Sequence, residues 1–186
     1  LLQHYDEELL QKQSEEHVEK LNPRFRIHNG YLEVASQQTF TFYPPAILET
    51  FLLLQIHPEI KGIRASTIRS IRNHLNLIND SYRRDIRSRS LFMEILRQPH
   101  GITHQLRRMN RYGVLAAYLP NFGNIVGRMQ YDLFHVYTVD EHILMVIRNM
   151  RRFALERHRY ECPRCHRVYR RLPKPELLYL AGLFHD

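Results

Sequence analysis

The feature that most constrains this chain is an apolar segment that ends in two polar residues. Residues 177–184 read Leu-Leu-Tyr-Leu-Ala-Gly-Leu-Phe, and His185 and Asp186 follow directly. A helix that is apolar on almost all sides is expected inside a core, and burying a histidine and an aspartate at its end costs free energy unless a partner satisfies them. Imidazole nitrogen and carboxylate oxygen are natural ligands of a divalent metal ion. The segment therefore predicts a buried helix that ends in two metal ligands.

A third candidate ligand lies upstream on a predicted amphipathic helix. Residues 139–154 carry apolar side chains at helical spacing. At about 100° per residue, His142 lies at the edge of the apolar face, whereas Glu141, Arg148 and Arg152 point away from it. Because the apolar face needs a partner, we expect this helix to pack against the C-terminal helix and to bring His142 next to the predicted ligands. The residues predicted for the apolar face are Val139, Ile143, Val146, Ile147, Met150, Phe153 and Ala154.

These residues carry a resemblance to a known family. His142, a connection, and then His185-Asp186 after an apolar run resemble the HD superfamily of metal-dependent phosphohydrolases. The wider context, residues 125–142 (Ile-Val-Gly-Arg-Met-Gln-Tyr-Asp-Leu-Phe-His-Val-Tyr-Thr-Val-Asp-Glu-His) followed by Leu183-Phe-His-Asp, is similar to the bacterial bifunctional PII uridylyltransferase/uridylyl-removing enzymes. The similarity extends over residues 25–186. Further matching segments are Asn29-Gly30, Tyr43-Pro-Pro-Ala-Ile-Leu48 and Tyr118-Leu-Pro-Asn-Phe122.

The resemblance implies a place for this chain within a larger protein. The family has a nucleotidyltransferase domain, a helical linking region, an HD domain and two small ligand-sensing domains. We therefore expect a mainly α fold, with a small β-hairpin in a helical linking domain and then the first helices of an all-α HD domain. The expected layout is an exposed helix over 1–22 that leaves the nucleotidyltransferase domain, a linking domain over 23–120 with its hairpin at 25–34, a connector over 121–138, and the start of the HD domain over 139–186.

The resemblance also implies a function. The family attaches UMP from UTP to the PII signalling protein when nitrogen is scarce, and the HD domain removes it when glutamine is high. His142, His185 and Asp186 would hold a divalent metal, magnesium or manganese, which would polarise the phosphodiester and lower the pKa of a bound water. The family's last aspartate ligand is expected beyond residue 186, so this piece alone is expected to be inactive. The Gly-Ser and paired aspartates of the uridylyl-adding site do not occur in it.

Two other groups of residues are weaker candidates for metal binding. His135 lies close to His142, but a histidine in a buried connector is more often a hydrogen-bonded core residue. Cys162-Pro-Arg-Cys165-His166 matches the C-x-x-C-H pattern of haem attachment, which requires export, and it is also half of a zinc site. We favour two free thiols in a surface loop. A zinc site completed by His158, His166 or a second molecule, and a redox switch, remain alternatives.

The rest of the chain is predicted to be mostly helical. Asn29-Gly30 between alternating residues predicts a type I′ hairpin, with His28 exposed beside the turn and a short extended piece at 39–43. Pro44-Pro45 opens a buried helix. Further helices are predicted over residues 65–79, from a cap at Asp80-Ser81 to Pro99, over 103–112 and over 114–119.

Charge leaves two rival functions open. The net charge is +8 and the pI is about 9.7, which is typical of proteins with anionic partners. We interpret the many arginines as solvated helix faces, with an arginine-rich RNA-binding module as the alternative. A second alternative is another HD phosphohydrolase, such as a guanosine-tetraphosphate hydrolase. The sequence contains no run of about 18 apolar residues, so we expect no membrane span. Two cysteines without a signal peptide favour the cytoplasm.

Overall fold

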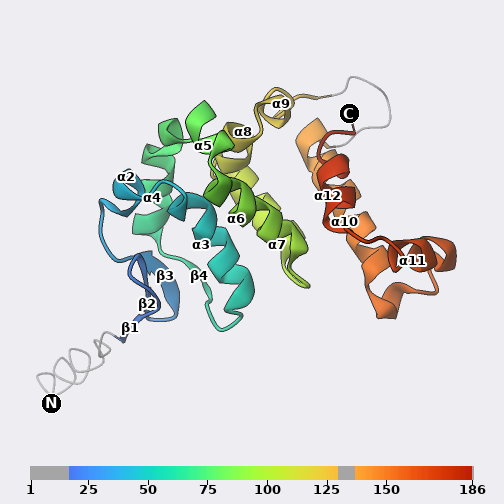
Figure 1. Ribbon diagram of the computed structural model, residues 1–186, viewed down its shortest axis with the longest axis horizontal. Coiled ribbons are helices and arrows are strands. Elements are labelled where there is room, and N and C mark those ends of the chain that lie inside the picture. Colours follow the sequence, from blue (N-terminus) through green and yellow to red (C-terminus); the bar gives the residue numbers. More distant parts are fainter. Residues whose placement is uncertain (1–16, 130–136, 186) are drawn as a thin grey trace, which may run out of the picture.

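The computed structural model describes residues 17–129 and 137–185. As predicted, this part of the chain is mainly helical with one small sheet. Figure 1 shows the sheet at the N-terminal end, a group of helices beside it, and α10, α11 and α12 at the C-terminal end. No helix of the described ranges is long and apolar enough to cross a membrane.

The sheet has four strands in the order β1-β2-β3-β4. The first two pairings are antiparallel and the last is parallel. Asn29 (φ 53°) and Gly30 (φ 82°) both have positive φ angles between β2 and β3, as a type I′ turn requires, so the predicted hairpin is confirmed. The strands are β1 (Val18–Lys20), β2 (Phe25–His28), β3 (Tyr31–Val34) and β4 (Gly62–Ile63).

Two local predictions at this end are wrong. The helix expected over residues 1–22 is a strand at Val18–Lys20, because its backbone pairs with β2; residues 1–16 lie outside the described ranges. The extended piece expected at 39–43 is instead a one-turn helix, α2 (Thr39–Phe42). Phe40 is fully buried and Phe42 is 78% exposed, whereas a strand would place both on the same face.

The helices follow the predicted order, with two breaks inside predicted helices and one short helix, Pro120–Gly123, at the start of the predicted connector. The first break is at His74, whose Nδ1 lies 2.7 Å from the Ser70 carbonyl oxygen. The second is at Asp85, whose carboxylate accepts from the N–H of Arg87. The helix that ends at this second break is capped at its start by Asn79 rather than by the predicted Asp80-Ser81. The elements from residue 46 to 123 are α3 (Ala46–Ile56), α4 (Ala65–Asn73), η1 (Leu75–Leu77), α5 (Asp80–Arg84), α6 (Ile86–Arg97), α7 (Ile102–Arg111), α8 (Val114–Tyr118) and α9 (Pro120–Gly123).

A single hydrophobic cluster connects both ends of the described chain. It begins at the sheet, passes through α3, α6, α7 and α8, and includes buried residues of the last helices. In α10 (Val139–Ala154) these are Ile143, Leu144 and Ile147. The remaining elements are η2 (Glu156–His158), α11 (Pro163–Tyr169) and α12 (Glu176–Gly182). Because α10 and α12 share this core and pack on α7 and α6, their position relative to the rest of the chain is fixed by packing.

Candidate metal centre

Helix α10 places His142 as the sequence predicts. The helix covers Val139–Ala154, and Ile143, Leu144 and Ile147 are fully buried on its inner face. Arg148 on the other side is exposed, and His142 is half-buried at the boundary. The apolar pattern therefore fixes the rotation of the helix, and the rotation brings the imidazole to the edge of the core.

His185 follows the last turn of α12 and is oriented by a hydrogen bond. Its Nδ1 lies 2.8 Å from the carbonyl oxygen of Gly182. A carbonyl oxygen can only accept, so Nδ1 of His185 donates this hydrogen bond and carries a proton. Metal-binding histidines are commonly oriented by a hydrogen bond of this kind from the second ring nitrogen.

The two imidazoles lie side by side, as the packing argument predicts. The ring centroids of His142 and His185 are 5.7 Å apart, at an interplanar angle of 37°. A divalent metal about 2 Å from a nitrogen of each ring fits this separation. Asp186 and His135 lie outside the described residues. Within the described residues, no group of three or more His, Cys, Asp or Glu side chains could hold a metal ion, so the metal site stays a prediction.

A close approach of the two helices brings the histidines together. A Cβ atom on Gly182 would lie 3.0 Å from Met150 Sδ and 3.3 Å from Ile147 Cγ1. Glycine therefore lets the last turn of α12 lie directly against α10. The prediction that this helix is buried on almost all sides is wrong for the described residues. Leu177 and Phe184 are 47% and 45% exposed and His185 is exposed as well, because α10 and α6 leave one side of α12 uncovered.

Asp140 anchors the start of α10, and the sequence analysis missed it. Its carboxylate is buried and accepts hydrogen bonds from the Asn110 side chain (2.8 Å) and the Gly127 N–H (3.0 Å). Burial alone raises the pKa of Asp140, but these hydrogen bonds outweigh burial and hold the pKa below its usual value. The partners come from α7 and from the connector, so no local pattern reveals them. They fix the turn of helix that carries His142.

The cysteine motif lies on a helix rather than in a loop. Cys162 precedes the first residue of α11 and Cys165 lies inside that helix. The two sulfur atoms form a disulfide, so the favoured prediction of free thiols is wrong. His166 Nδ1 lies 2.8 Å from the Phe153 carbonyl oxygen, and its Nε2 lies 3.3 Å from a Glu156 carboxylate oxygen. The zinc site stays a prediction without support from these contacts.

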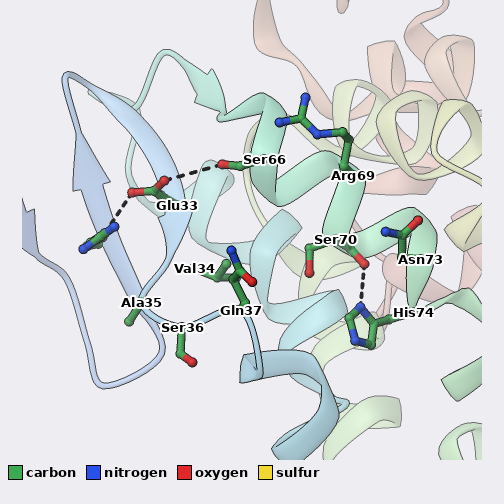
Figure 2. A pocket seen from close by; sticks show the side chains of 11 residues that line it. Glu33, Val34, Ala35, Ser36, Gln37, Ser66, Arg69, Ser70, Asn73 and His74 are labelled. Atoms are coloured by element: carbon green, nitrogen blue, oxygen red, sulfur yellow. Dashed lines mark hydrogen bonds and ion pairs between the residues drawn. The ribbon is translucent and has the colours of Figure 1, made fainter.

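A hollow of about 450 Å³ lies between β3 and α4. Figure 2 shows the Glu33 carboxylate in it, bonded to Ser66 and to an arginine side chain, which is Arg26. His28, predicted to be exposed, is 7% exposed and its Nδ1 lies 3.2 Å from Glu33. Burial raises the pKa of Glu33, but the hydrogen bonds from His28 and Arg26 outweigh burial and hold the pKa below its usual value. The ion pair of Glu33 with Arg64 joins the hairpin to the residue before α4, so Glu33 supports the fold.

Comparisons with known proteins agree with the sequence resemblance. Residues 25–118 match the family described as "Uridylyltransferase GlnD third domain". The whole chain is 59% identical to the bifunctional uridylyltransferase/uridylyl-removing enzyme of Nitrosococcus oceani, 55% to that of Methylococcus capsulatus and 51% to that of Hydrogenovibrio crunogenus.

The chain spans 21% of the length of each of these relatives. No solved structure matches it. The family match covers half of the chain and identity continues through all of it. The chain therefore belongs to the GlnD family of bifunctional uridylyltransferase/uridylyl-removing enzymes.

Proposed function

We propose that this chain links the two activities of a bifunctional enzyme and begins its uridylyl-removing domain. The relatives are named for both activities. The observation that carries the proposal is the pairing of His142 with His185, whose rings are 5.7 Å apart although they lie 43 residues apart in the chain. Two helices of one core bring them together, which is the arrangement expected at the start of an HD domain.

The proposed layout follows the sequence. Residues 23–120 form the linking domain, 121–138 the connector, and 139–186 the beginning of the HD domain. The hydrogen bonds of Asp140 to Asn110 and to the Gly127 N–H tie the first turn of α10 to both preceding segments. This anchoring suits a hydrolytic site whose position must be kept relative to the rest of the enzyme.

His142, His185 and Asp186 are proposed to hold a magnesium or manganese ion together with a ligand from outside this chain. The ion, when bound, supplies a Lewis acid for phosphodiester hydrolysis and lowers the pKa of water. The residues of the chain would hold the ion and keep its histidine ligands in their orientation. The Gly182 carbonyl keeps the proton of His185 on Nδ1, and the buried face of α10 fixes the rotation of His142.

The substrate is proposed to be the PII protein modified with UMP at a tyrosine, with glutamine promoting removal and UTP serving addition, in the cytoplasm. The relatives' names support uridylyl transfer and removal. In this proposal the uridylyl-adding residues lie outside residues 1–186. The two reactions are therefore separable by substitutions in this chain.

The test uses the full-length enzyme with His185→Ala and Asp186→Ala combined. We expect uridylyl removal to be abolished and uridylyl addition to stay within about twofold, because the ligand set loses two members. Thermal unfolding with and without magnesium or manganese provides the folding control. A folded double variant that still strips UMP from PII at the normal rate would show that the metal assignment is wrong.

A further inference from the structure

A basic cleft of about 850 Å³ lies between the start of α7 and the C-terminal half of α10. It is a different place from the histidine pair. His142 and Arg152 are ten residues apart on α10, which is about 15 Å along a helix. The cationic side chains of the cleft are Arg107, Arg148, Arg151, Arg152 and Arg157, and the carboxylate among its lining residues is Glu156.

Helical spacing places several of these side chains on the same wall of the cleft. Arg148, Arg151 and Arg152 form one stripe on α10, since residues three and four apart share a face. His104 and Arg107, three apart on α7, line the opposite wall. The cleft therefore concentrates positive charge from two elements that are separate in the sequence.

The start of α7 adds to this positive potential. Gly101 precedes the ten-residue helix, offers no side-chain cap, and is followed by no acidic residue in the first turn. The first backbone N–H groups of a helix lack intrahelical partners and carry the positive end of the helix dipole. Gly101 and the next three residues line the cleft, so these groups lie at its wall.

The arginines divide into those used by the fold and those open to a ligand. Arg151 donates to the Pro99 carbonyl oxygen and to the Tyr179 hydroxyl, and Arg152 pairs with Glu161. Arg107 has only a 3.9 Å contact with Glu141.

Within the described ranges, Arg148 forms no hydrogen bond or ion pair, and it is exposed. The Glu156 carboxylate forms an ion pair with Arg159, which does not line the cleft, at 2.7 Å. The cleft therefore keeps an excess of positive charge.

We propose that this cleft binds a small anion that carries a chain of two or more phosphate groups. Guanidinium groups match phosphate oxygens as two-pronged donors, and the volume lies within the range of small-molecule sites. The described lining contains no Phe, Tyr or Trp. Single-stranded nucleic acid is usually held by stacking on such rings, so the lining favours a polyphosphate group over an RNA strand.

The probe is inorganic tripolyphosphate, titrated calorimetrically into the 186-residue chain at low and at physiological salt. We expect binding that weakens as salt screens the charges. The test variant combines Arg107→Ala with Arg148→Ala and should weaken binding at least tenfold. Its matched control combines Arg84→Ala with Arg89→Ala, which removes the same charge from exposed arginines of α5 and α6. The control should bind within twofold of the unchanged chain.

Further arms separate the sources of the anion. ATP binding at the affinity of tripolyphosphate, with the same loss in the test variant, supports recognition of the phosphate chain alone, and tighter ATP binding supports a nucleotide. Arg148→Lys keeps the positive charge but loses the two-pronged guanidinium donor. Its affinity for tripolyphosphate should lie between those of the unchanged chain and of Arg148→Ala.

Three results would overturn the proposal. One is no binding of tripolyphosphate to the unchanged chain. Another is equal weakening in the test and control pairs, which would indicate net charge alone. The third is binding of single-stranded poly(U) through the cleft arginines when tripolyphosphate does not bind. Circular dichroism confirms that each variant is folded, and none of the substituted arginines belongs to the proposed metal site.

Discussion

The two ends of α10 present different chemistry from one helix. Near its start, the half-buried His142 lies beside the exposed His185, with the ring centroids 5.7 Å apart. Near its end, Arg148 and Arg152 project from the opposite side into a basic cleft. Neutral imidazole nitrogens suit a metal ion, whereas guanidinium groups repel metal ions and suit phosphates. A single amphipathic helix therefore separates two binding chemistries by rotation and by length.

The two ends also differ in how firmly they are held. The start of α10 is fixed by the buried Asp140 and its bonds to Asn110 and the Gly127 N–H. The arginine side chains at the other end are mostly exposed. A site that must position a reacting bond benefits from rigid supports, while an electrostatic cleft tolerates mobile side chains. Substitutions at the two ends should therefore have different consequences.

The largest expected effect is on the uridylyl-removing reaction. His142→Ala in the full-length enzyme should lower the rate of UMP release from modified PII by about 100-fold or more, because loss of an orienting partner alone typically costs 10–100-fold. Uridylyl addition should stay within about twofold. Initial rates of both reactions measure this difference. Arg84→Ala, at an exposed position of α5 outside both sites, serves as the control and should keep both rates within about threefold. Equal losses for His142→Ala in both reactions would remove the distinction.

The second prediction concerns stability. Asp140→Ala should lower the free energy of unfolding of the chain by about 1–3 kcal/mol, because it leaves the Asn110 amide and the Gly127 N–H without their acceptor. Arg148→Ala should change it by no more than about 0.5 kcal/mol, as is usual for exposed positions. Urea unfolding of both variants measures the difference. Similar values for the two would show that the start of α10 is not the better anchored end.

The sequence predicted the features that depend on local periodicity. The bounds of α10, its buried face and the Asn29-Gly30 hairpin follow from spacing and turn chemistry. The neighbouring positions of His142 and His185 follow from two apolar helices that need a shared partner. Such predictions succeed because the local pattern and the tertiary packing agree.

The features that the sequence missed depend on contacts with other elements of the fold. His28 is buried because Glu33 and the Arg64 guanidinium contact it. Val18–Lys20 is a strand because β2 offers a free edge. Thr39–Phe42 is a helix although its residues alternate, because Phe40 enters the core and Phe42 does not. In each case a tertiary contact outweighs the local preference.

A smaller effect is expected where α10 and α12 approach most closely. Gly182→Ala should destabilise the chain by about 1 kcal/mol, at the low end for overpacking, because the nearest atom is the Sδ of Met150 at 3.0 Å and methionine adapts easily. Met150→Ala alone should also destabilise it. The combined variant should be more stable than the sum of the two single effects, since the new methyl group then has room. Additive effects in urea unfolding would indicate that the contact does not constrain α12.

The smallest expected effect is a pH dependence at the start of α12. The N–H at the helix start lowers the pKa of Glu176, and so does Arg97, whose Nε lies 3.1 Å from the carboxylate; burial opposes them, but the pKa is held below its usual value. A carboxyl group with a depressed pKa in the folded state stabilises the fold above its unfolded pKa of about 4.3, and this stabilisation is lost as the pH falls through the folded value. Glu176→Gln should therefore lower the free energy of unfolding at pH 6 to 7, by less than about 1 kcal/mol because Arg97 is half-exposed.

The difference between Glu176→Gln and the unchanged chain should shrink as the pH falls below the unfolded pKa of about 4.3 and then through the lower pKa of the folded chain. Urea unfolding at a series of pH values measures it. The same substitution in an Arg97→Ala background should show a weaker pH dependence, because one of the two groups that lower the pKa is gone. A difference that instead grows toward low pH would mean that the folded-state pKa is raised. The contact between α6 and α12 would then work against the docking of the helix that carries His185, and the firmly held end of α10 would depend on Asp140 and apolar packing alone.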